Sequence, residues 1–60
     1  MKFTITIQCE NDSFFESPGA EVARILAELA SNPALEFATR DTSIQLWDVN
    51  GNKVGNAYFV

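Results

Sequence analysis

Residues 46–59, LWDVNGNKVGNAYF, decide the fold, because they read as two strands joined at an Asn-Gly pair, residues 50–51. Asn-Gly tolerates the positive φ angles of a type I′ turn, the two-residue connection that matches the twist of a β-hairpin. The turn predicts strands over residues 43–49 and 52–59, with Asp48 opposite Lys53 as an attractive charge pair. A three-residue loop, which moves one strand's side chains to the opposite face, is the alternative register.

The two-residue register also predicts which side chains share a face of the hairpin. The expected pairs are Trp47 opposite Val54, Leu46 opposite Gly55, Gln45 opposite Asn56, Ile44 opposite Ala57 and Ser43 opposite Tyr58. One face then carries Ile44, Leu46, Ala57 and Phe59, and the other carries Trp47, Val49, Val54 and Tyr58.

Residues 2–9, KFTITIQC, alternate between apolar and polar side chains. This period of two, rich in β-branched residues, predicts a strand with one buried face. The apolar face carries Phe3, Ile5, Ile7 and Cys9, and the Cys9 thiol is expected there as inert packing.

Residues 18–31 are predicted to form a helix, with Ser17 as its cap and Pro18 in its first turn. Its apolar face carries Val22, Ile25, Leu26 and Leu29, and its solvated face carries Glu21, Arg24 and Glu28, with Arg24 placed to pair with both glutamates. Proline 33 disfavours helical geometry at the preceding residue, so the helix should stop near Ser31. We expect a loop over residues 32–42 with about one helical turn.

These elements predict one α+β domain, residues 1–60, in the order β-α-β-β. A single amphipathic helix covers one face of a three-stranded antiparallel sheet, and the third strand lies in the middle. At least one of Phe14 and Phe15 should cover the end of the core beside the helix.

Composition argues against several classes of function. The net charge is −4 and the four basic residues are scattered, whereas nucleic-acid binding needs clustered Lys and Arg. No stretch has the 18 or more apolar residues of a membrane span, and the N-terminus does not resemble a signal peptide. Cys9 is the only cysteine, so no disulfide forms within the chain; with no export signal, we expect a cytoplasmic protein.

The sequence has few side chains that could carry out enzymatic chemistry, so we predict a non-enzymatic protein without cofactor or metal. The chain has no histidine, no serine with a recognisable base partner and no glycine-rich phosphate loop. The stretch DVNGN, residues 48–52, has the wrong spacing for a calcium loop: its glycine comes fourth instead of sixth.

The candidate protein-binding residues are Trp47, Val54 and Tyr58, expected together on the sheet face that the helix leaves uncovered. Trp and Tyr are enriched at interaction hot spots. Three interpretations stay open for this face: internal cross-strand packing, a homodimer interface, and a surface for another protein. Glu10 and Asp12, close to Glu16, predict an acidic rim that is either solvated or engages basic residues of a partner.

The segments MKFTITIQCENDSF, EVARILAELA and DVNGNKVG together resemble a group of small proteins encoded by bacteriophages and prophages. The shared features are a Phe-x-Ile-x-Ile strand, a Glu-Val-Ala-Arg-Ile-Leu helix and an Asp-x-Asn-Gly-Asn-x-Val-Gly hairpin. The resemblance implies a phage protein that binds and blocks a host protein, for example of a defence system such as CRISPR–Cas. The alternative is a structural or accessory phage protein that forms a homo-oligomer through the exposed sheet face.

Overall fold

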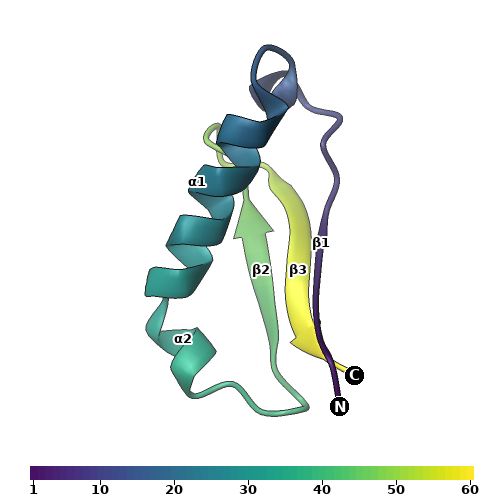
Figure 1. The fold of residues 1–60 in the computed structure, drawn as a ribbon, viewed down its shortest axis with the longest axis vertical. Coiled ribbons are helices and arrows are strands. Elements are labelled where there is room, and N and C mark those ends of the chain that lie inside the picture. The colour runs from purple at the N-terminus through teal and green to yellow at the C-terminus, as the bar shows by residue number, and fades with distance from the viewer.

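The computed structural model describes all residues, 1–60, and combines a β-sheet with helices (Figure 1). The elements are β1 (Phe3–Ile7), the 3-10 helix η1 (Asp12–Phe14), α1 (Pro18–Ser31), α2 (Pro33–Glu36), β2 (Ser43–Trp47) and β3 (Lys53–Phe59). The three strands form one antiparallel sheet in the order β1-β3-β2. The predicted fold class and the central position of the last strand are therefore confirmed.

The helix α1 has the bounds that the sequence predicts, although its first turn is capped differently. The Ser17 side chain makes no capping hydrogen bond, and only its carbonyl accepts from the Glu21 N–H, at 3.2 Å. At the other end Asn32 begins the one-turn helix α2, because its side-chain oxygen accepts from the Ala34 N–H at 3.0 Å. The expected loop with one helical turn is thus present.

The hairpin register is as predicted from Ser43–Tyr58 to Leu46–Gly55, but the turn is not. The loop has three residues, 49–51, closed by a 2.9 Å hydrogen bond from the Asp48 N–H to the Asn52 carbonyl. Only Gly51 has a positive φ, 84°, so a type I′ turn is excluded and the alternative loop length is correct at the tip.

A β-bulge reconciles the longer loop with the unchanged register below it. Trp47 pairs with Lys53 and Leu46 with Gly55, so Val54 is an extra residue in β3. The bulge turns Val54 to the helix side, where it is only 4% exposed. The predicted Trp47–Val54 and Asp48–Lys53 pairs and the placement of Val54 on the uncovered face are therefore wrong.

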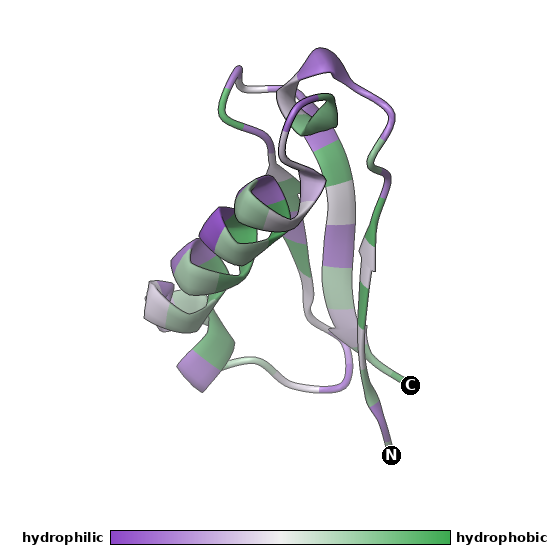
Figure 2. Cartoon of the chain, turned by 45° about the horizontal axis from the view of Figure 1, so that its top comes forward, coloured by the Kyte–Doolittle hydropathy of each residue, from purple (hydrophilic) through white to green (hydrophobic).

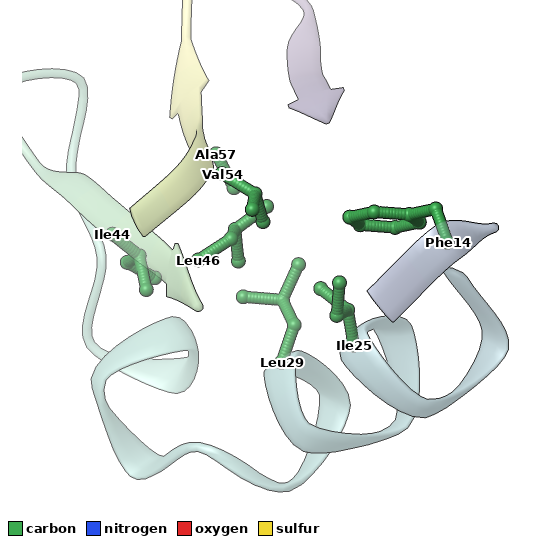
Figure 3. Close-up of a cluster of buried hydrophobic side chains, with 7 residues drawn as sticks. All are labelled: Phe14, Ile25, Leu29, Ile44, Leu46, Val54 and Ala57. Carbon is green, nitrogen blue, oxygen red and sulfur yellow. The ribbon is translucent and has the colours of Figure 1, made fainter. Parts of the chain in front are cut away.

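The hydrophobic core lies between α1 and the hairpin, and η1 closes one end (Figure 3). Its seven buried side chains are Phe14, Ile25, Leu29, Ile44, Leu46, Val54 and Ala57. Phe14 thus takes the predicted position at the end of the core, whereas Phe15 is 84% exposed. None of the seven comes from β1.

The strand β1 lies at the edge of the sheet, away from α1 (Figures 1 and 2). Phe3 and Ile5 face the helix side but stay 39% and 40% exposed, and Cys9 is exposed. The predicted burial of this face is wrong for these three residues. A helix about 10 Å across covers about two strands spaced at about 4.8 Å, so the third strand is left open.

Candidate binding surface

The hairpin turn is anchored to the rest of the domain through the buried carboxylate of Asp48, which is 4% exposed. Its Oδ1 accepts from the backbone N–H groups of Asn50 and Asn52, at 3.0 and 2.8 Å. Its Oδ2 accepts from the side chains of Asn11, Ser13 and Asn52, at 3.0, 3.0 and 3.2 Å. Three of these hydrogen bonds lie within the turn, and the two from Asn11 and Ser13 tie it to η1 and its N-cap.

A second buried carboxylate, Glu21, links α1 to the same turn. Its Oε2 accepts from the Val49 N–H at 2.8 Å, and its two oxygens bind Arg24 at 2.8 and 3.1 Å. Arg24 also pairs with Glu28 and donates to the Trp47 carbonyl at 3.0 Å. Both predicted ion pairs are confirmed, but Glu21, at 7% exposed, is not on a solvated face because the turn covers it.

The surroundings of these carboxylates hold them ionised. Burial raises the pKa of Asp48, but the hydrogen bonds from Asn52, Asn11 and Ser13 together lower it far below its usual range. The hydrogen bond from Arg24 lowers the pKa of Glu21, burial opposes this, and the Val49 N–H lowers it further. Neither group is therefore an acid that exchanges a proton near neutral pH.

Both lowered pKa values predict that the domain loses stability in acid. A carboxyl whose folded-state pKa is depressed stabilises the fold above its unfolded pKa, and this contribution disappears as the pH falls through the folded value. We expect Tm to be level near neutrality and to fall below about pH 4, the ordinary carboxyl range. Thermal melts from about pH 7 to about pH 2 measure this dependence. The fall of Tm with decreasing pH should be shallower in Asp48→Asn, which lacks this carboxyl group. A wild-type Tm that stays constant to about pH 2 would contradict it.

Beside the turn, the free edge of β2 runs along a groove whose other wall is α1. This edge groove has a volume of about 840 Å³. Its lining residues include Arg24, Ala27, Glu28, Gln45, Trp47 and Val49. At its end near the turn, the groove is bordered by two exposed apolar residues, Trp47 (51%) and Val49 (63%). The alternation of β2 directs the Trp47 side chain to the sheet face away from α1.

The backbone of β2 has hydrogen-bonding groups free at this edge. Lys2 and Val60, which flank β1 and β3, exchange backbone hydrogen bonds of 2.7 and 2.8 Å. Counting back from Val60, every second residue of β3 therefore bonds to β1. The intervening residues of β3 bond to β2, which leaves the N–H and C=O groups of Ser43 and Gln45 directed outward. Arg24 caps the next outward carbonyl, that of Trp47. The open part of the edge therefore centres on Gln45.

The structure separates the predicted aromatic site. Trp47 and Tyr58 share the uncovered face, but Tyr58 lies opposite Ser43, four residues and about 13 Å along β2 from Trp47. Gln45 and Asn56 fill the interval, and Val54 is in the core on the other side. There is no continuous cluster of Trp47, Val54 and Tyr58.

The predicted acidic residues are partly brought together. Asp12 and Glu16 line a hollow with the exposed ring of Phe15, and Arg24 lines both this acidic hollow and the edge groove. Glu10 is exposed outside the hollow. Val49, which the sequence places on the uncovered face, is exposed, and Phe15 is an exposed apolar group that sequence reasoning did not assign to a binding surface. The available signal for Phe15 was the Phe14-Phe15 pair, because one ring is enough to cover the end of the core.

Comparison with protein-family models, curated proteins and solved structures gives no match. No helix of the structure combines the length and the apolar character needed to cross a bilayer.

Proposed function

We propose that the protein is a non-enzymatic binding module that takes an extended segment of a partner protein into the edge groove. The observation that carries this proposal is the open edge of β2 beside the half-exposed ring of Trp47. An extended segment adds to such an edge through backbone hydrogen bonds, while side-chain pockets supply selectivity. The segment pairs with Gln45, and an apolar side chain of the partner contacts Trp47.

Charge favours a partner segment that carries Lys or Arg. The net charge of the chain is −4, and the carboxylates of Asp12, Glu16 and Glu28 lie around the groove and the adjoining hollow. Complementary charge steers association and selects partners. The resemblance to phage proteins makes a bacterial host protein, such as a component of an anti-phage defence system, the proposed source of this segment.

A displayed library of random unstructured peptides tests the proposal without knowledge of the host. Selection on the wild-type protein, with counter-selection on Gln45→Pro, should enrich extended sequences that contain Lys or Arg. Proline at position 45 removes an outward N–H and leaves the ladder to β3 intact, and Gln45→Ala is the control that keeps the N–H.

Trp47→Ala should lower the affinity for the selected peptides about thirtyfold, as expected for a tryptophan at the centre of an interface. Lys53→Ala, at the exposed residue opposite Trp47, should leave binding within about threefold because Lys53 does not line the groove. Circular dichroism melts verify that each variant is folded. Peptides that bind wild type, Gln45→Pro and Trp47→Ala equally would refute the proposal, as would a failure to enrich any peptide.

A further inference from the structure

The outer edge of β1 combines unpaired backbone groups with exposed apolar side chains. Lys2 and Gln8 both donate backbone hydrogen bonds to β3, to Val60 and Val54, each at 2.7 Å. By alternation the N–H and C=O groups of Phe3, Ile5 and Ile7 point away from the sheet, where the Ile7 carbonyl accepts from the Cys9 thiol at 3.7 Å. A flat apolar edge of this kind is a template for pairing with another chain.

The accessible surface of the single chain is also larger than its mass predicts. The accessible surface is 4242 Å², against about 3,900 Å² expected for a compact monomer of 6.6 kDa. The molecule is elongated, 34 × 19 × 17 Å, and β1 contributes no side chain to the buried core. The face of β1 is therefore available for a further contact.

The sequence of β1 is complementary to itself when two copies run antiparallel. In the register that places Ile5 opposite Ile7 of a second copy, Phe3 lies opposite Cys9 and Thr6 opposite itself. The same register, continued past the end of β1 at Ile7, places Lys2 opposite Glu10 at both ends. Both side chains are exposed and neither has an ion-pair partner within the chain, where the only pairs are those of Arg24.

We propose that two copies of this chain associate through β1 in this register and form a continuous six-stranded sheet. The two-fold axis passes beside Thr6, which makes the interface isologous, with the same contacts made twice. The outward backbone groups of Phe3, Ile5 and Ile7 pair across the junction, and the Lys2–Glu10 pairs select the register. The proposal is independent of the edge groove, which lies on the opposite edge of the sheet.

A charge-swap experiment tests this pairing. Sedimentation equilibrium over a concentration series should give twice the 6.6 kDa chain mass for wild type. Lys2→Glu and Glu10→Lys each create two like-charge pairs and should weaken association about tenfold or more. The double variant Lys2→Glu/Glu10→Lys should restore it. A wild-type mass of 6.6 kDa at every concentration, or a dimer indifferent to all three variants, overturns the proposal.

Disulfide trapping provides a second readout with a matched control. In Phe3→Cys, the introduced thiol lies opposite Cys9 of the second copy, at the spacing of about 5.5 Å that a disulfide accepts. Positions 3 and 9 of one strand are about 20 Å apart, so an internal disulfide is excluded. Mild oxidation should give a covalent dimer in Phe3→Cys and much less in Phe15→Cys, whose site is more exposed but lies outside β1. Equal cross-linking in both variants overturns the register.

Discussion

Gly55→Ala is expected to destabilise the domain more than any other single-methyl addition. A Cβ at this position would lie 1.8 Å from the Thr6 carbonyl oxygen, 2.8 Å from the Thr6 carbonyl carbon and 3.1 Å from Ile7 Cα. All three atoms are backbone of β1, so no side chain can rotate to relieve the contact. Alanine must therefore push β1 away from β3 and break the ladder between them.

The free energy of unfolding should fall by about 3 kcal/mol or more, as for severe overpacking. A 60-residue domain has a total stability of about 3–9 kcal/mol, so the variant is close to unfolded. Urea denaturation followed by circular dichroism measures the difference. Amide exchange of a variant that still folds should show lost protection in β1 first.

Gly19→Ala is the matched control, because a Cβ there has no atom within 4 Å. It lies in the first turn of α1, where alanine is the better helix former by up to about 1 kcal/mol. Adding the same methyl group should thus lower the free energy of unfolding at position 55 and raise it at position 19. A Gly55→Ala variant as stable as Gly19→Ala would contradict the close approach of β1 and β3.

Asp48→Ala is the second change with a large expected effect. It removes the acceptor of five part-buried hydrogen bonds, two of which join η1 and its N-cap to the hairpin. We expect Tm to fall by at least about 10 °C, since a domain this small shifts several degrees for each lost interaction. Asp48→Asn should also destabilise, because its NH₂ group would face donors.

Asp41→Asn and Asp41→Ala are the controls for charge and truncation, because the Asp41 side chain is exposed and makes no hydrogen bond. Both should stay within about 2 °C of wild type, as surface substitutions usually do. Differential scanning calorimetry of the four variants gives the comparison. If the two variants at position 48 melt like those at position 41, the turn is not anchored through this carboxylate.

The parts of the fold that local patterns determine could be predicted from the sequence. Pro18 and the Asn32-Pro33 pair gave the bounds of α1, since each acts on its own neighbours. Strict alternation predicted β1. The two-residue Asn-Gly turn predicted the hairpin pairs from Ser43–Tyr58 to Leu46–Gly55 correctly, because the bulge offsets the longer loop. The acidic side chains of Asp12 and Glu16 could be grouped because they are close in sequence.

The errors arise where contacts distant in sequence outweigh local preference. The Asn-Gly pair favours a two-residue turn, but Asn11 and Ser13, 37 and 35 residues before Asp48, bind its carboxylate and stabilise a different one. The longer loop requires the bulge that moved Val54 to the core and dispersed the predicted aromatic site. The edge groove depends on how α1 lies across the sheet, which no local pattern specifies.

The seven core residues include no side chain of β1, and of this strand only Ile7 packs against them. Because β1 is held chiefly by its ladder to β3, it can separate from the sheet while α1 and the hairpin keep their packing. Such partial opening needs less free energy than unfolding the whole chain, so the domain consists of two cooperative units of unequal stability. In the single chain the N-terminal strand is the weaker unit, so we expect proteases and misassembly to act first on residues 1–8 of the monomer, and pairing of β1 with a second copy to protect them.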